Sequence, residues 1–133
     1  MSGSQSWSVR IVVTGDGTTK FQPWGVGANP GDPAKAQVGD IISWGNATNQ
    51  PHQPWPTEGN TQNGNPLASN PPGSPLFFSA PIPPQGSSTP QFPMPASLPP
   101  ATPNGPTTPL TAGSVIYYCC LNHPAERGQI VIF

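Results

Sequence analysis

The distribution of proline most constrains what this chain can fold into. Its 22 prolines all lie within residues 51–109, except for Pro23, Pro30, Pro33 and Pro124. Proline lacks a backbone N–H donor and has a fixed φ, so it interrupts helices and is confined to sheet edges. We therefore expect most of this segment to lie on the surface in extended, polyproline-like conformation. The flanking sequence is left to form the core.

The flanks carry the alternation of apolar and polar residues that is typical of half-buried strands. In the first flank, every second residue from Trp7 to Val13 is apolar. Strands are predicted at residues 7–13, 19–21, 41–44, 115–120 and 129–133. No helix of three turns is predicted. The pattern indicates a small all-β sandwich or barrel with one long insertion.

A length of 133 residues is typical of one domain. We expect residues 1–133 to form a single domain and residues 55–109 to be its insertion, with one or two strands. One strand is expected near Phe77 and another near Gln91, and residues 25–35 should be loop.

The chain carries little charge, with 7% charged residues and a net charge of −1. Its four basic residues are scattered, whereas nucleic-acid and anionic membrane surfaces are bound by clustered Lys and Arg. We therefore expect no nucleic-acid partner. No apolar run is long enough to span a bilayer. The polar start lacks the layout of a secretory signal, so the protein either stays inside the cell or is a mature form with an added Met1, and we favour the second interpretation.

The residues most informative about chemistry are Cys120 and His123, just after the predicted strand 115–120. A thiolate and an imidazole three residues apart can face one metal ion, and the other histidine of the chain, His52, follows another strand. Sulfur with nitrogen suits copper or zinc, and a His2Cys set with a weak axial group is the blue-copper pattern. Structural zinc usually takes four Cys or His ligands, which favours copper. From spacing alone, a chance Cys-x-x-His without metal remains an alternative.

Two longer motifs extend this pattern. Residues 38–46, VGDIISWGN, followed by Pro51-His52, resemble the strand and loop that supply the first histidine in cupredoxins, most closely in the amicyanin and plastocyanin branch. Residues 118–131, YCCLNHPAERGQIV, resemble the C-terminal ligand loop of that family. Two weaker patterns, at residues 21–23 and 78–84, are also similar. The two ligand motifs stand in the family's order.

The resemblance implies a Greek-key β-barrel or sandwich that holds one copper ion between His52, Cys120 and His123. It implies that Cys119 is not a ligand. A disulfide between Cys119 and Cys120 is disfavoured, because neighbouring residues meet its geometry poorly. By the same resemblance the chain is expected to be a periplasmic or secreted one-electron carrier, cycling between Cu(II) and Cu(I). Its redox partner protein would dock near His123.

The chain departs from the family at position 126, where Glu126 replaces the axial methionine. A carboxylate is a hard anion that favours Cu(II), so ligation by Glu126 predicts a lower reduction potential and a more tetragonal site. In the alternative, Glu126 points to solvent or pairs with Arg127. Met94 is another candidate for the axial ligand. Asn46 is expected either to link the two ligand loops near the thiolate or simply to close a turn.

Electron transfer would make the chain a carrier rather than an enzyme, with no catalytic residues. Two other functions remain open. A red-copper or type-2-like site with an open position would support small-molecule redox chemistry or sensing. A copper-storage or structural module would use the fold only as a scaffold. The insertion either caps the metal end, with Pro54 and Trp55 nearest, or lies far from it.

Overall fold

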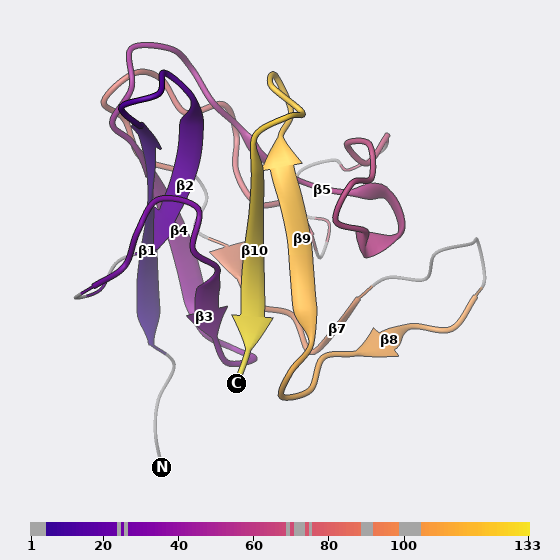
Figure 1. Ribbon diagram of the computed structural model, residues 1–133. Coiled ribbons are helices and arrows are strands. Elements are labelled where there is room, and N and C mark those ends of the chain that lie inside the picture. Colours follow the sequence, from indigo (N-terminus) through magenta and orange to yellow (C-terminus); the bar gives the residue numbers. More distant parts are fainter. Residues whose placement is uncertain are drawn as a thin grey trace.

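Two four-stranded β-sheets pack against each other in the computed structural model (Figure 1), which describes residues 5–23, 25, 27–68, 70, 74, 76–88, 92–98 and 105–133. The first sheet contains β1 (Ser6–Val13), β2 (Thr19–Pro23), β4 (Ile41–Asn46) and β6 (Phe92–Pro93). The second sheet contains β3 (Ala34–Ala36), β5 (Pro54–Pro56), β9 (Val115–Cys120) and β10 (Arg127–Ile132). A separate two-stranded ribbon pairs β7 (Ser97–Leu98) with β8 (Thr108–Pro109).

The strand order joins distant parts of the sequence. It is β2-β1-β4-β6 in the first sheet and β3-β10-β9-β5 in the second. In the first sheet, β1 pairs antiparallel with β2 and parallel with β4. In the second, β9 and β10 form an antiparallel hairpin, and β3 runs parallel to β10. The loop of that hairpin and the segment after β4 carry the candidate ligands.

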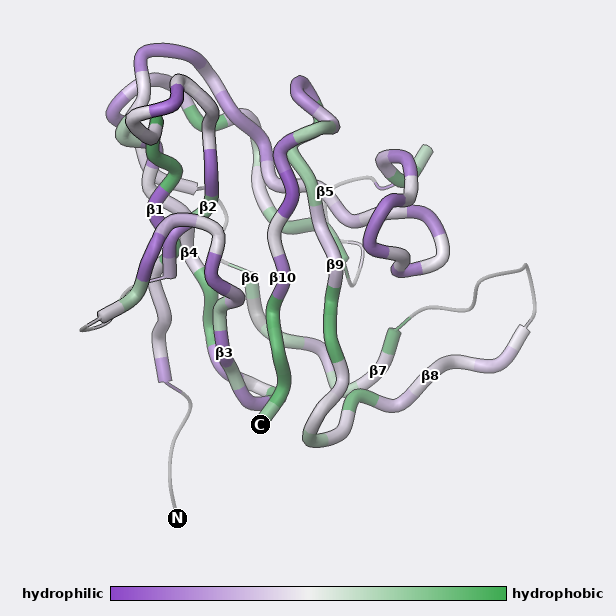
Figure 2. Tube along the Cα trace, in the orientation of Figure 1, coloured by the Kyte–Doolittle hydropathy of each residue, from purple (hydrophilic) through white to green (hydrophobic). Residues whose placement is uncertain are grey.

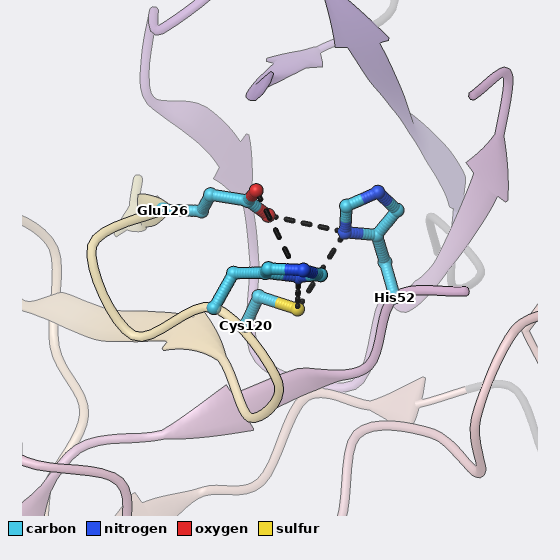
Figure 3. A group of neighbouring side chains, drawn as sticks. His52, Cys120 and Glu126 are labelled. Atoms are coloured by element: carbon cyan, nitrogen blue, oxygen red, sulfur yellow. Dashed lines mark hydrogen bonds and ion pairs between the residues drawn. The ribbon is translucent and has the colours of Figure 1, made fainter. Parts of the chain in front are cut away.

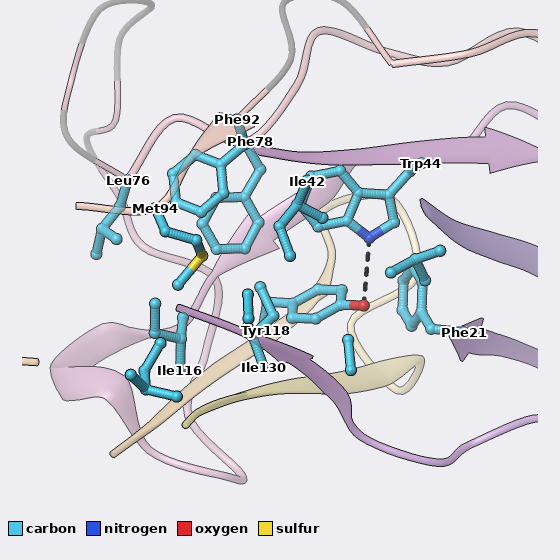
Figure 4. Close-up of a cluster of buried hydrophobic side chains, with 14 of the residues drawn as sticks. Phe21, Ile42, Trp44, Leu76, Phe78, Phe92, Met94, Ile116, Tyr118 and Ile130 are labelled. Atoms are coloured by element: carbon cyan, nitrogen blue, oxygen red, sulfur yellow. Dashed lines mark hydrogen bonds between the residues drawn. The ribbon is translucent and has the colours of Figure 1, made fainter. Parts of the chain in front are cut away.

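The core lies between the two sheets and centres on Trp44 (Figure 4). Its indole ring stacks on Phe78 at a centroid distance of 5.3 Å, and its Nε1–H donates a hydrogen bond of 3.2 Å to the Tyr118 hydroxyl. Alternate residues of the strands supply much of this core, and the insertion adds Leu76, Ile82 and Met94. Figure 2 shows apolar stretches along β9 and β10 and a hydrophilic tip on the loop between them.

The first part of the insertion covers the edge of the second sheet. β5 pairs with the end of β9, as expected for a proline-rich strand at a sheet edge. A 3₁₀ turn, η1 (Glu58–Asn60), follows. Beyond β5, the Asn60 side chain continues the pairing: its Nδ2 donates to the Val115 carbonyl at 2.7 Å and its Oδ1 accepts from the Tyr117 N–H at 2.8 Å. The backbone groups of β9 are therefore not left open to another chain.

The all-β sandwich expected from the sequence is confirmed, and within the described residues its sheets do not close into a barrel. All five strands predicted in the flanks are present. The strand expected near Phe77 is wrong: Phe77 N–H donates to the Ser74 carbonyl and closes a turn. The ring of Phe77 packs on Trp55, whereas the ring of Phe78 enters the core beside Trp44, so these two neighbours contribute to two different clusters.

Three smaller expectations were not confirmed by the structure. Gln91 lies outside the described residues, although β6 begins at the next residue. The expected loop at residues 25–35 instead runs into β3, a short strand from Ala34. Val13, the last residue of the apolar alternation, is 56% exposed. Among the described residues, no helix has the length and hydropathy needed to cross a bilayer.

Candidate metal centre

Four potential metal ligands meet at one end of the sandwich. They are His52, Cys120, His123 and Glu126, and one ligand atom from each lies within 4.8 Å of all the others. His52 comes from the segment between β4 and β5, whereas the other three belong to the end of β9 and the loop before β10 (Figure 3). The structure thus brings together all four residues that the sequence proposed as ligands.

Both histidines turn the same ring nitrogen toward the thiol. The Nδ1 atoms of His52 and His123 each lie 3.6 Å from the Cys120 Sγ. The Glu126 carboxylate closes the group, with Oε1 at 3.1 Å from His52 Nδ1 and Oε2 at 3.8 Å from His123 Nδ1. One sulfur, two nitrogens and a carboxylate therefore converge on one small volume.

A compact hairpin loop sets the spacing of the three C-terminal ligands. The His123 N–H donates to the Cys120 carbonyl at 3.1 Å, and the Glu126 N–H donates to the His123 carbonyl at 2.8 Å. The Cys120 N–H closes the loop by donating to the Glu126 carbonyl at 3.0 Å. These successive turns place three side chains of a seven-residue stretch, Cys120 to Glu126, on one side of the loop.

Cys120 is fully buried, at the inner face of β9 that it shares with Ile116 and Tyr118. Burial raises the pKa of its thiol, although the backbone N–H of Gln53 donates to Sγ at 3.4 Å and opposes that shift. Metal ions bind the thiolate, so a cation in this position would supply the charge that stabilises it. Cys119 is also free and buried, and the alternation of the strand places it on the opposite face.

Glu126 provides the observation that tests whether a metal fits. Its Oε1 is buried and, among the described residues, no donor reaches it in hydrogen-bond geometry. Its contact with His52 Nδ1, at 3.1 Å, lies outside that geometry, so this buried carboxylate oxygen is poorly satisfied and a cation among these donors would stabilise it. The side chain is turned toward the histidines (Figure 3), not toward solvent or Arg127. The donor set therefore fits a bound metal ion.

The two histidines differ in exposure. His52 is 1% exposed, and this burial lowers the pKa of its imidazole, with Glu126 acting in the opposite direction. A neutral imidazole is the form that binds metals. The side chain of His123 is 37% exposed and is followed by the exposed residues Pro124 and Ala125. His123 is thus the more exposed of the two candidate histidine ligands.

Asn46 lies at the end of β4 and braces the His52 segment. Its Nδ2 donates to the carbonyls of Gln50, Ile82 and Pro83, at 2.7 Å, 3.1 Å and 3.2 Å. Its Oδ1 accepts from the N–H and the hydroxyl of Thr48, at 2.9 Å and 2.7 Å. These bonds join the turn before His52 to the insertion rather than to the Cys120 loop.

Gln53 links the two ligand loops, and the sequence reasoning missed it. Besides its N–H contact to Cys120 Sγ, its carbonyl accepts from the Leu121 N–H at 2.8 Å. Its side-chain Nε2 donates to the Ser79 carbonyl at 3.0 Å. Two of these bonds use the backbone and carry no residue signature, so its position directly after His52 was the one available signal.

The structure also places Met94, the other axial candidate, and the insertion relative to the ligand group. Met94 is buried in the core and pairs through its backbone with Asp40, before the start of β4, whereas the His52 segment follows the end of β4. Met94 therefore does not join the ligand group. The insertion does reach the site, because Ile82 and His52 exchange backbone hydrogen bonds of 2.8 Å and 3.1 Å.

Comparison with known proteins bears on the fold. No family model and no curated protein sequence matches the chain. The structure is similar to a purple cupredoxin from Nitrosopumilus maritimus, with a TM-score of 0.55 and 17% identity, over 98% of this chain and 100% of that one. A reduced amicyanin variant gives a TM-score of 0.45 at 17% identity, over 76% of this chain and 69% of that one. A second variant, the Cu(I) form at pH 4, gives 0.46 at 14% identity, over 100% and 85%. From its two-sheet architecture and its match to the purple cupredoxin along nearly its whole length, this chain has the cupredoxin fold.

Proposed function

We propose that this protein binds one copper ion through His52, Cys120, His123 and Glu126 and serves as a one-electron carrier. The observation that carries the proposal is the convergence of these four side chains, with ligand atoms within 4.8 Å of one another, at one end of a cupredoxin fold. The buried Oε1 of Glu126 faces His52 Nδ1 at 3.1 Å but accepts no hydrogen bond among the described residues, which supports a cation at their centre.

The donor set favours copper over other metals. One thiolate with two imidazoles is the ligand combination of copper electron-transfer sites, while structural zinc usually takes four Cys or His ligands. When bound, copper supplies one-electron chemistry by cycling between Cu(II) and Cu(I). The protein's part is to hold the ligands in place through the hairpin loop and the Gln53 bonds, so that little rearrangement accompanies each transfer.

His123 is the proposed point of electron exchange. It is the more exposed of the two imidazoles, and Pro124 and Ala125 beside it are exposed and uncharged. We propose that a redox partner protein docks on this surface. Because the chain has so few charges, the association rate should depend weakly on ionic strength. The proposal includes a periplasmic or secreted location, where cupredoxins typically work.

Glu126 as the fourth ligand sets this site apart from one with an axial methionine. A carboxylate carries negative charge and is hard, so it stabilises Cu(II) relative to Cu(I). The reduction potential should therefore be lower with Glu126 than in a Glu126→Met variant. The approach of the carboxylate to His52 supports this role.

The test is a Cu(II) titration of the metal-free, reduced protein, followed by visible absorption and electron paramagnetic resonance. We expect an intense thiolate-to-copper band that saturates at one copper per chain, and its loss in Cys120→Ser. Cys119→Ser is the matched control, because Cys119 is an equally buried thiol on the other face of β9. The control should keep the band.

Other outcomes would redirect or reject the proposal. Absence of the band from the wild-type protein, or its loss only in Cys119→Ser, would contradict the site. A band that shifts when azide is added would show an open coordination position. That result would favour small-molecule redox chemistry or sensing over electron transfer.

A further inference from the structure

The residue after Glu126 is anchored by the insertion. Arg127 begins β10, and its Nη1 donates a hydrogen bond of 2.5 Å to the carbonyl of Gly64. Neighbouring residues of a strand point to opposite faces, so Arg127 lies on the outer face of the second sheet, in register with Cys119. Glu126 points the other way, toward the histidines.

The Gly64 carbonyl is held in a fixed position. Its turn is closed by a bond of 2.8 Å from the Glu58 N–H to the Asn65 carbonyl, and by one of 3.2 Å from the Gly64 N–H to the Thr61 carbonyl. A Cβ on Gly64 would collide with the Thr61 hydroxyl and come within 3.0 Å of the Glu58 carbonyl, so only glycine fits. Asn60, in the same turn, bonds the backbone of β9.

This arrangement separates two opposite charges that are adjacent in sequence. A guanidinium bonds more strongly to a carboxylate than to a neutral carbonyl. A free Arg127 would therefore compete with a metal ion for Glu126. In the described part of the chain, Arg127 forms no ion pair with Glu126 and bonds Gly64 instead.

We propose that the turn at residues 57–65 positions Glu126 as a metal ligand, acting through the bond from Arg127 to Gly64. Arg127 is a positioning residue: it fixes the start of β10 and keeps its own charge away from the carboxylate. This inference rests on the proposed copper site. It gives part of the proline-rich insertion a role in tuning the metal.

The experiment compares copper-loaded variants in two backgrounds, Glu126 and Glu126→Ala. Arg127→Met removes the donor, and Gly64→Ala displaces the acceptor while Arg127 is kept. We expect both to shift the visible spectrum toward that of Glu126→Ala and to weaken Cu(II) binding about tenfold, as is typical for residues that orient ligands. Neither should cause a further change in the Glu126→Ala background. Arg127→Lys should restore part of the wild-type spectrum.

Controls separate positioning from general loss of stability. Arg10→Met removes an exposed arginine from β1 and should leave the spectrum unchanged. Thermal unfolding of the metal-free variants shows which of them are folded. If Arg127→Met does not fold, Gly64→Ala tests the same contact from its other side.

Two results would overturn the inference. One is a wild-type spectrum in both Arg127→Met and Gly64→Ala. The other is an equal spectral shift in the two backgrounds, because the effect would then not pass through Glu126. Failure of the proposed function is distinct: the wild-type protein itself would lack the thiolate-to-copper band.

Discussion

Replacing Asn46 by alanine should destabilise the protein by removing one side chain that organises the His52 segment. Asn46 is 2% exposed and forms five hydrogen bonds. Three are donated to the carbonyls of Gln50, Ile82 and Pro83, and two are accepted from Thr48. A methyl group at this position can make none of them.

The cost of Asn46→Ala depends on which groups lose their last partner. The three carbonyls each keep a second donor: the Thr48 hydroxyl at Gln50, the His52 N–H at Ile82 and the Gly86 N–H at Pro83. The buried N–H of Thr48 keeps none among the described residues, because Asn46 Oδ1 is its acceptor. One orphaned donor and several lost bonds together predict a loss of about 3 kcal/mol in the free energy of unfolding. The melting temperature should fall by about 10 °C.

Urea denaturation of the metal-free protein measures this loss directly. Thr48→Val completes a double-mutant cycle, and we expect its effect with Asn46→Ala to be non-additive, because both changes remove the bond from the Thr48 hydroxyl to Asn46 Oδ1. A loss below about 0.5 kcal/mol, the range of an ordinary surface substitution, would refute this reasoning.

Three further predictions concern the core and acid stability. Gly128→Ala would place a Cβ 2.6 Å from the Tyr118 hydroxyl oxygen, so the ring must move. We expect calorimetry to show a loss of about 3 kcal/mol in the free energy of unfolding. An unchanged melting temperature would contradict this packing. Tyr118→Phe leaves the indole N–H of Trp44 unpaired and should cost about 1–2 kcal/mol in urea denaturation, whereas a neutral effect would rule out that bond. Burial raises the pKa of Asp40, but hydrogen bonds from the N–H groups of Gln5 and Gln37 and from the Trp7 indole outweigh it and hold that pKa below its ordinary value. The carboxylate therefore stabilises the fold above its unfolded pKa of about 3.9, and this is lost as the pH falls through the lower folded pKa. Acid unfolding should be steeper in the wild-type protein than in Asp40→Asn, and equal slopes would contradict this assignment.

Much of the fold follows from local patterns. The strands at both ends of the chain are predicted by alternation of apolar and polar residues, because one face of each strand packs on the core. The ligand motifs are also local, since Cys120, His123 and Glu126 share one hairpin loop. Their meeting with His52 required the resemblance to cupredoxins, because nothing in the sequence alone brings β4 and β9 to the same end of two different sheets.

The insertion was the least predictable part of the structure. β5 and β6 pair with the edges of β9 and β4, and β7 and β8 pair with each other, so the insertion's pairings are made through backbone groups. The bracing of β9 by Asn60 and the hold of Gly64 on Arg127 have no periodic signature. The same applies to Gln53, whose role depends on the meeting of two ligand loops.

X-ray absorption spectroscopy at the copper edge, on the copper-loaded wild-type protein in both oxidation states, tests the central claim most directly. We predict one sulfur and two imidazole nitrogens around copper in both states, with an additional oxygen in Cu(II) that is absent from Glu126→Ala. A sulfur scatterer retained in Cys120→Ser, or a first shell without sulfur in the wild-type protein, would contradict the account.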